Sequence, residues 1–156
     1  MQKEIDKAKI SAFRLLKFRI RSIKEMEMRL KKKNFSLAVI REVLDFLLDL
    51  EYLDDLTFAR SWIINRRQLN PRSKRLITYE LKQKGVDLNI IEQAFNMLGD
   101  DPDIEIAQGL AARKYEKLKQ LSPDIIKRRL ISFLQRKGFS SAIIFNIVKG
   151  LISNDE

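Results

Sequence analysis

The chain has 156 residues, of which 45% are hydrophobic and 33% are charged, and it contains neither cysteine nor histidine. These absences exclude disulfides, thiol nucleophiles and zinc sites of the usual ligands, and they remove the side chain that most often acts as a general base near neutral pH. The net charge of +10 favours a polyanionic partner over the alternative of a merely soluble basic protein. Such a partner would be a nucleic acid, an anionic membrane or an acidic protein surface.

The first ten residues are charged throughout and contain no signal-peptide core. No apolar run approaches the roughly 18 residues that a membrane span requires. We therefore expect a cytoplasmic protein with no membrane partner. Only 5 glycines and 3 prolines are present, too few for the many tight turns of an all-β fold, and this composition favours helices.

One phrase of twelve residues recurs three times along the chain. The copies are RLKKKNFSLAVI at residues 29–40, ELKQKGVDLNII at 80–91 and FLQRKGFSSAII at 133–144, and they align without gaps. In each copy a lysine is followed by asparagine or glycine, then by an apolar residue, then by serine or aspartate. This order is typical of a helix that ends in a left-handed residue and leads into a second, capped helix. Each phrase therefore predicts a tight corner between two helices.

Apolar residues at helical spacing flank each corner and predict an amphipathic helix on either side. A further helix is expected upstream of each pair, over about residues 7–21, 56–67 and 103–118. The expected fold class is therefore all-α, with three tandem three-helix repeats stacked into an elongated, curved helical array. We expect these repeats to span residues 1–50, 51–100 and 101–156.

Acidic residues stand at the starts of two of the upstream helices. Asp54 and Asp55 precede the first helix of the middle repeat, and Asp103 opens that of the third. The Asp54–Asp55 pair raises the possibility of a metal site, but no other acidic cluster has suitable spacing, and Asp100 and Asp101 fall in an expected linker. We expect the acids to cap these helices, and we expect no metal and no cofactor.

Basic side chains form a stripe in each expected repeat. In the first repeat their spacing places them on one face of the first helix, and in the second a tyrosine lies among them, as a stacking platform for bases would. The alternative for any single stripe is a solvated surface, but three stripes with few interleaved acids favour anion binding in one shared groove. The predicted binding residues are Arg14, Lys17, Arg21 and Lys24 in the first repeat, Arg66, Arg67, Arg72, Arg75, Tyr79 and Lys82 in the second, and Arg113, Lys114, Lys127, Arg128, Arg129, Arg136 and Lys137 in the third.

Four stretches of the chain resemble the RecX family of bacterial recombination regulators. They are YLDDLTFA at residues 52–59, ELKQKGV at 80–86, RKY at 113–115 and KRRLISFLQRKGFSSAIIFNIV at 127–148. The resemblance extends from about Ala12 to Leu151. This sequence departs from the usual pattern of the family at three positions. Glu51 replaces a glycine before the tyrosine, Asn34 replaces the corner glycine of the first repeat, and Leu76 occupies a position at which arginine is common.

The resemblance implies three tandem three-helix repeats, no catalytic activity and two kinds of partner. Members bind RecA, the recombinase that polymerises on single-stranded DNA, lie along the groove of that filament and typically inhibit its ATP hydrolysis and strand exchange. They also bind DNA themselves. The expected partners are therefore the RecA filament and single-stranded DNA, with double-stranded DNA left open, and we expect the protein to be a monomer.

Three other functions are compatible with parts of the sequence. A helical-repeat protein that binds nucleic acid without a RecA partner would carry the same basic stripes. An adaptor that docks an acidic protein alone would carry the same charge. A nuclease or other enzyme is disfavoured, because the sequence has no Gly-rich phosphate loop, no GxSxG motif and no other catalytic constellation.

Overall fold

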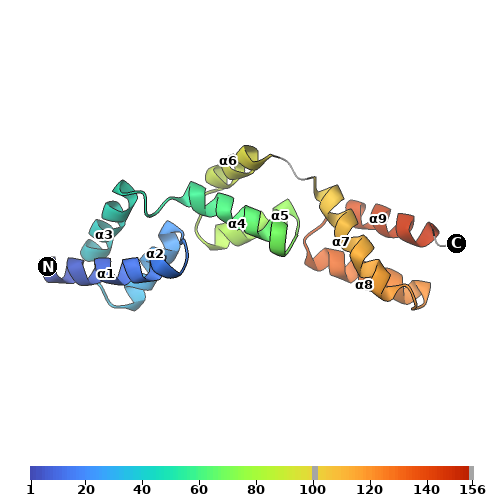
Figure 1. Cartoon of the computed structure of the whole chain (residues 1–156), viewed down its shortest axis with the longest axis horizontal. Coiled ribbons are helices and arrows are strands. Elements are labelled where there is room, and N and C mark those ends of the chain that lie inside the picture. The colour runs from blue at the N-terminus through green and yellow to red at the C-terminus, as the bar shows by residue number, and fades with distance from the viewer. Residues whose placement is uncertain (100–101, 155–156) are drawn as a thin grey trace. The chain divides into compact units, whose positions relative to one another are not determined.

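The computed structural model describes residues 1–99 and 102–154, and all the regular structure in these ranges is helical. Nine helices lie within them, in three groups of three (Figure 1). The helices are α1 (Gln2–Phe18), α2 (Ile23–Lys32), α3 (Leu37–Asp49), α4 (Asp55–Leu69), α5 (Lys74–Gln83), α6 (Leu88–Leu98), α7 (Asp103–Leu118), α8 (Pro123–Arg136) and α9 (Ser141–Ser153). The all-α class with tandem three-helix repeats is confirmed. The boundary expected between residues 100 and 101, and the acids expected there, lie outside the described residues.

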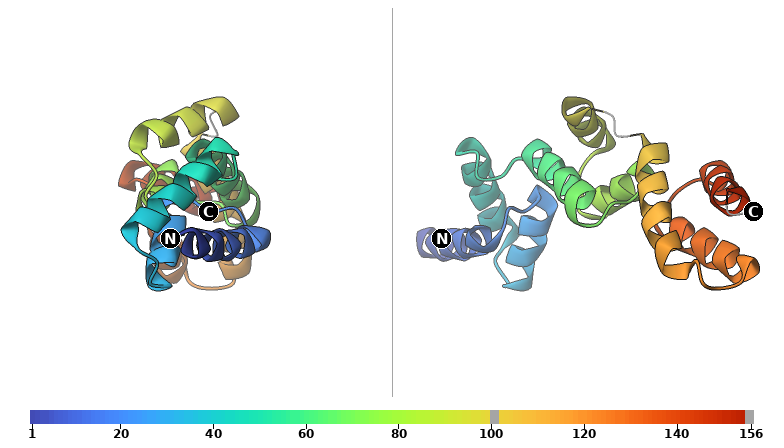
Figure 2. Two further views of the ribbon diagram at one scale, coloured as in Figure 1. Left: turned by 90° about the vertical axis from the view of Figure 1, so that its left-hand side faces the viewer. Right: turned by 45° about the vertical axis from the view of Figure 1, so that its right-hand side comes forward.

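The chain forms two compact units that do not follow the repeat boundaries. The N-terminal unit contains Met1–Trp62 and Glu80–Leu98, and the C-terminal unit contains Ile63–Tyr79 and Gly99–Glu156. The division passes through α4 and α5, so the middle repeat contributes to both units. The helices of each unit can be followed in the two further views of Figure 2. Within the described residues, no helix is long and apolar enough to cross a lipid bilayer.

Each unit has a hydrophobic core built from one complete repeat. In the first repeat α1, α2 and α3 all contact one another, and Met26, Leu30 and Leu47 are fully buried between them. In the third repeat α7, α8 and α9 do the same, with Leu130 and Leu134 fully buried. These core positions belong to the apolar columns that the recurring phrase places at helical spacing. The pattern therefore predicts which face of each helix is buried.

The three predicted corners are confirmed. The left-handed residues are Asn34 with φ 63°, Gly85 with φ 80° and Gly138 with φ 87°. The amide of the apolar residue that follows donates to the carbonyl five residues earlier in all three, which is the bond that closes a Schellman motif. These bonds join Phe35 to Leu30 at 3.4 Å, Val86 to Leu81 at 3.1 Å and Phe139 to Leu134 at 3.3 Å.

The first helix ends earlier than expected. The apolar pattern predicts a helix over about residues 7–21, but α1 ends at Phe18 and Arg19 is extended, with φ −166° and ψ 162°. A new helix then begins with a capping box, in which the Ser22 hydroxyl accepts from the Glu25 amide and the Glu25 carboxylate accepts from the Ser22 amide. The sequence carries this signal as Ser-x-x-Glu. It outweighs the run of helix-forming residues around it.

A tight joint connects the first two repeats inside the N-terminal unit. The Ser22 hydroxyl donates to the carbonyl of Lys84 at 2.6 Å, and the Asp55 carboxylate accepts from the amide of Ile23 at 2.9 Å. Gly85 lies against α2 so closely that a Cβ there would overlap the side chain of Lys24. The start of α2 is thus held by the middle repeat, and we call these contacts the first joint.

A similar joint connects the second and third repeats inside the C-terminal unit. The amide of Ser73 donates to the carbonyl of Lys137 at 2.9 Å, and the Asp103 carboxylate accepts from the amide of Lys74 at 3.0 Å. A Cβ on Gly138 would overlap the Ser73 hydroxyl and lie 2.8 Å from Cβ of Leu76. We call these contacts the second joint. Each joint places the corner of one repeat on the second helix of the repeat before it.

The joints correct the expected role of the acids and explain Asn34. Asp54 does cap its own helix, through the amide of Leu56 at 3.0 Å, but the Asp55 and Asp103 carboxylates accept from the first amide of the second helix of the preceding repeat. Gly85 and Gly138 require both a left-handed backbone and the absence of a Cβ. Asn34 is exposed and requires only the left-handed backbone, which asparagine tolerates well.

Candidate nucleic-acid interface

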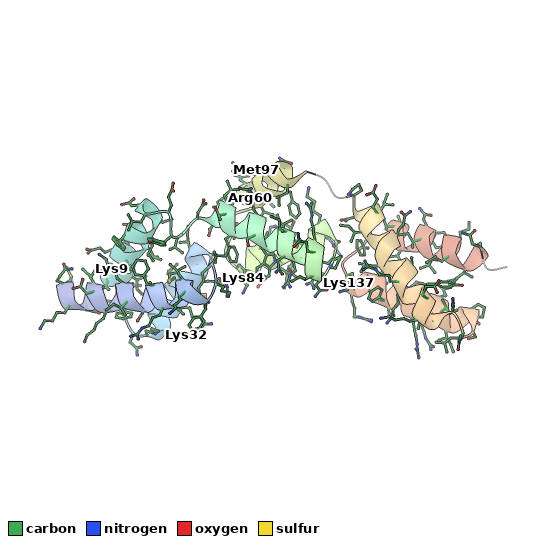
Figure 3. The ribbon with its side chains drawn as sticks, in the orientation of Figure 1. Lys9, Lys32, Arg60, Lys84, Met97 and Lys137 are labelled. Carbon is green, nitrogen blue, oxygen red and sulfur yellow. The ribbon has the colours of Figure 1, made fainter. Side chains whose placement is uncertain are left out.

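The second joint gathers cations from distant parts of the sequence. Lys137, labelled in Figure 3, is half-buried at the corner, and its Nζ donates to the Asn70 side-chain oxygen at 2.6 Å. Burial lowers the pKa of Lys137, and the neighbouring positive charges of Arg72, Arg136 and Arg66 lower it further. We call Arg66, Arg72, Arg136 and Lys137 the joint cluster. It brings the end of α4, the segment before α5 and the end of α8 to one place.

A hollow between α7 and α8 continues this positive surface. It has a volume of about 380 Å³ and is lined by Lys114, Arg128, Arg129, Ser132 and Arg136. Arg136 belongs both to this cationic hollow and to the joint cluster. Across residues 1–99 and 102–154, Arg128, Arg129 and Arg136 form no ion pair with a carboxylate. Their charge is therefore not neutralised by a nearby acid in that part of the chain.

Phe133 lies between the joint cluster and the cationic hollow. Its ring centroid is 5.3 Å from Nζ of Lys114 and 5.9 Å from Nζ of Lys137, both within the range of a cation–π contact. The ring therefore helps to position one lysine of each group. The joint cluster and the cationic hollow together form what we call the cationic surface of the C-terminal unit.

This surface has the chemistry of a phosphate-binding site. Guanidinium groups bind phosphate oxygens in bidentate fashion, ammonium groups act as point charges, and the Ser132 hydroxyl can donate a further hydrogen bond. The surface can therefore attract and orient a polyanion. Within the described residues, no group of three or more Asp, Glu, His or Cys side chains could hold a metal ion.

The stripe predicted in the first repeat does not exist as one helical face. Arg14 and Lys17 are exposed on α1, but Lys24 is on α2, where it lies 3.6 Å from the Glu27 carboxylate. Arg21 lies between the two helices and is only 8% exposed, with its Nε donating to the carbonyl of Leu15 at 3.3 Å. Burial lowers the pKa of Arg21. Its role is to hold the α1–α2 connection.

The predicted residues of the middle repeat divide between structural and exposed roles. Arg72 precedes α5, so it is not on the helical face shared by Arg75, Tyr79 and Lys82. The Arg75 guanidinium donates to the carbonyl of Gly138 at 3.2 Å, which makes it part of the second joint. Tyr79 is 59% exposed and Lys82 is exposed, so both can meet a ligand. Arg67 donates to the carbonyl of Gly99 at 3.2 Å.

The remaining predicted residues of the third repeat lie on α7 and α8. Arg113 is exposed and its Nε donates to the carbonyl of Gly109 at 3.3 Å, within the same helix. Lys127 is exposed on α8, outside the lining of the cationic hollow. Binding by any of the predicted residues stays a prediction.

Sequence reasoning missed Asn70, Phe133 and the difference between the corner lysines. Lys84, also labelled in Figure 3, corresponds to Lys137 in the repeat, yet its Nζ lies 2.9 Å from the Glu25 carboxylate. The same position is therefore neutralised at the first joint and surrounded by arginines at the second. A signal was available, because Glu25 stands three residues after Ser22, whereas the corresponding position three residues after Ser73 is Leu76, which carries no charge.

Comparison with known proteins places this architecture in a family. The family models described as the first, second and third three-helix domains of RecX match residues 8–47, 54–94 and 101–148. A solved structure of RecX from Lactobacillus salivarius matches with a TM-score of 0.80 and 26% identity, over 97% of this chain and 98% of that one. A second RecX structure matches with a TM-score of 0.76 and 21% identity, which supports the fold alone.

Curated relatives share the name "Regulatory protein RecX". The protein of Bacillus pumilus (strain SAFR-032) is 36% identical over 83% of this chain and 49% of its own length, and that of Bacillus subtilis (strain 168) is 35% identical over 90% and 53%. The chain thus spans about half the length of these relatives. The protein of Mycolicibacterium vanbaalenii (strain DSM 7251 / JCM 13017 / BCRC 16820 / KCTC 9966 / NRRL B-24157 / PYR-1) is 30% identical over 96% of this chain and 85% of its own length. With three domain models in tandem and a relative matched over most of both lengths, the chain belongs to the RecX family.

Proposed function

We propose that this protein regulates RecA by binding the RecA–single-stranded DNA filament, and that it inhibits RecA ATP hydrolysis and strand exchange. It acts by binding and not by catalysis. Membership of a family of regulatory proteins supports a regulatory role, and the resemblance noted from the sequence supplies RecA and DNA as the partners.

The cationic surface of the C-terminal unit is the observation that carries this proposal. Arginines without a neighbouring carboxylate in the described residues surround a hollow, and a half-buried lysine beside them has its pKa lowered by burial and by three arginines. Assembling like charges in one place is unfavourable for the isolated protein, so the arrangement favours an anionic ligand. DNA phosphates within the filament, and acidic patches of RecA, are ligands of this kind.

Inhibition follows if one protein molecule contacts neighbouring RecA protomers. Contacts through different repeats would add through effective concentration, so individually weak contacts would yield stable binding. Bridged protomers would resist the rearrangements that accompany nucleotide turnover and strand exchange. Because phosphate contacts release counterions, binding should weaken steeply as salt concentration rises.

Equilibrium binding to bare and to RecA-coated single-stranded DNA tests the proposal. The experiment uses one labelled oligonucleotide, with and without RecA and a non-hydrolysable nucleotide, at two salt concentrations. We expect tighter binding to the coated DNA and a loss of affinity at the higher salt concentration. Equal affinity for both forms would instead support a nucleic-acid-binding helical repeat without a RecA partner. Binding to RecA without DNA, with little salt dependence, would support an adaptor.

A further inference from the structure

The third repeat differs from the other two on one exposed face of its last helix. The residue that follows the buried isoleucine of the recurring phrase is Arg41 in α3 and Glu92 in α6, and both are exposed. The corresponding residue of α9 is Phe145, which is 60% exposed. A position that carries a charge in two repeats therefore carries an aromatic ring in the third.

Phe145 belongs to an apolar groove between α8 and α9, within the C-terminal unit. The groove has a volume of about 310 Å³ and is lined by Lys127, Ile131, Phe145, Val148, Lys149, Ile152 and Ser153. On α9 the lining residues recur at 145, 148, 149 and 152, and on α8 at 127 and 131. These are helical spacings, so the groove runs along both helices and has the form that receives a helical segment.

Two lysines flank the apolar floor of this groove. Lys127 comes from α8 and Lys149 from α9, and no carboxylate is among the described lining residues. The Nζ of Lys149 lies 5.9 Å from the centroid of the Phe145 ring, which holds the ammonium group beside the aromatic surface. Lys149 corresponds to Asp45 and Asn96 in the first two repeats. Among the three repeats, a positive charge at this position of the last helix is therefore found only in the third.

We infer that the α8–α9 groove is a docking surface for an acidic amphipathic helical segment of a partner protein. One or two large apolar side chains of that segment would cover Phe145 and Ile131, and carboxylates on either side would face Lys127 and Lys149. Aromatic residues are enriched in the buried centres of protein interfaces, and a polar rim surrounds them. This inference concerns a surface separate from the cationic surface and does not depend on the proposed function.

A synthetic helical peptide tests the inference directly. The probe is a fluorescein-labelled peptide of about four turns, with leucine on one helical face and glutamate on its flanks, the pattern that helix-in-groove sites recognise. The comparison peptide has lysine in place of every glutamate. We expect the protein to bind the acidic peptide and to bind the lysine peptide at least tenfold more weakly. Equal binding of the two peptides would overturn the inference.

Substitutions locate the binding. Phe145→Glu places in α9 the residue that α6 already carries in the same column, so the fold should tolerate it, and we expect at least a tenfold loss of affinity. Lys127→Glu with Lys149→Glu should cause a similar loss. Phe18→Glu changes another exposed phenylalanine, 84% exposed in the N-terminal unit, and should leave the affinity unchanged. Unchanged binding by Phe145→Glu, with its fold verified by circular dichroism, would refute the docking surface.

Sedimentation of the wild type and of Phe145→Glu tests whether a second copy of this chain occupies the groove instead. If the wild-type protein forms a dimer in sedimentation and Phe145→Glu is a monomer, the groove binds a second copy and the inference fails.

Discussion

The joints make a quantitative prediction at their corner glycines. Gly85 has φ 80°, and a Cβ there would overlap Cβ of Lys24 and lie 2.6 Å from its Cγ. Gly99 has a similar φ of 76°, but nothing lies within 4 Å of its Cβ position. Asparagine tolerates the left-handed backbone, as Asn34 shows at φ 63° in the first repeat. Replacing each glycine by asparagine therefore separates the cost of the added Cβ from the cost of the backbone conformation.

Gly85→Asn should lower the free energy of unfolding by about 1–3 kcal/mol, the usual cost of forcing extra atoms into a packed contact. Gly99→Asn should stay within about 0.5 kcal/mol of the wild type, as a surface substitution without steric conflict. For a chain of this length, 1 kcal/mol changes the melting temperature by about 2–4 °C. Urea and thermal unfolding, followed by circular dichroism, measure both variants. Equal destabilisation by the two substitutions would show that no close contact exists at the first joint.

Three further predictions concern stability. Ser22→Ala removes a buried hydroxyl that both caps α2 and donates to the Lys84 carbonyl, so it should lower the free energy of unfolding by about 2–3 kcal/mol. Ser36→Ala removes only an exposed cap and should lower it by about 1 kcal/mol. Equal losses of stability in urea unfolding would contradict the contact between Ser22 and Lys84. Burial opposes ionisation of Glu25, but its bonds with Arg19 and Lys84 lower its pKa from 4.5 to about 2, so it contributes stability above about pH 4.5 that is lost as the pH falls towards 2. That contribution is at most about 3 kcal/mol, because solvent screens the exposed Arg19 partner. Glu25→Gln should flatten this part of the pH–stability curve, and a Glu25→Gln curve parallel to that of the wild type would refute the assignment. Glu51 has φ 60° at the end of α3, so Glu51→Gly should stabilise the protein by about 1 kcal/mol in the same unfolding assay, and a loss of stability would show that its side chain contributes more than its backbone strain costs.

The repeated phrase contains enough information to predict most of the fold. Its Lys–Gly/Asn–apolar order predicts the three corners, because few residues accept a left-handed backbone, and its apolar columns predict the buried faces. The end of α1 was predicted wrongly, although the Ser22–Glu25 capping box is readable in the sequence. That motif has to be weighed against a continuous run of good helix formers on both sides of it.

The site was less predictable, because the sequence does not show which basic side chains already form hydrogen bonds or ion pairs within the fold. Arg21, Arg75 and Lys84 are basic residues that donate to carbonyls or carboxylates within the fold, and only the structure identifies them as such. The joint cluster could not be predicted from the sequence either, because it depends on the contact between Ser73 and Lys137, which are 64 residues apart. Helical spacing relates residues within one helix, whereas this surface is assembled across a joint between two repeats.

A RecA ATPase titration tests most directly whether the cationic surface binds the RecA filament. The assay compares the wild type with Arg128→Glu/Arg136→Glu and with Lys119→Glu/Lys117→Glu, which makes the same change of charge on exposed lysines outside the cationic hollow. Both variants should keep their helical content. We predict that the wild type and the Lys117/Lys119 variant inhibit ATP hydrolysis on single-stranded DNA, and that the Arg128/Arg136 variant requires at least tenfold more protein. Undiminished inhibition by the folded Arg128/Arg136 variant would contradict binding through the cationic surface.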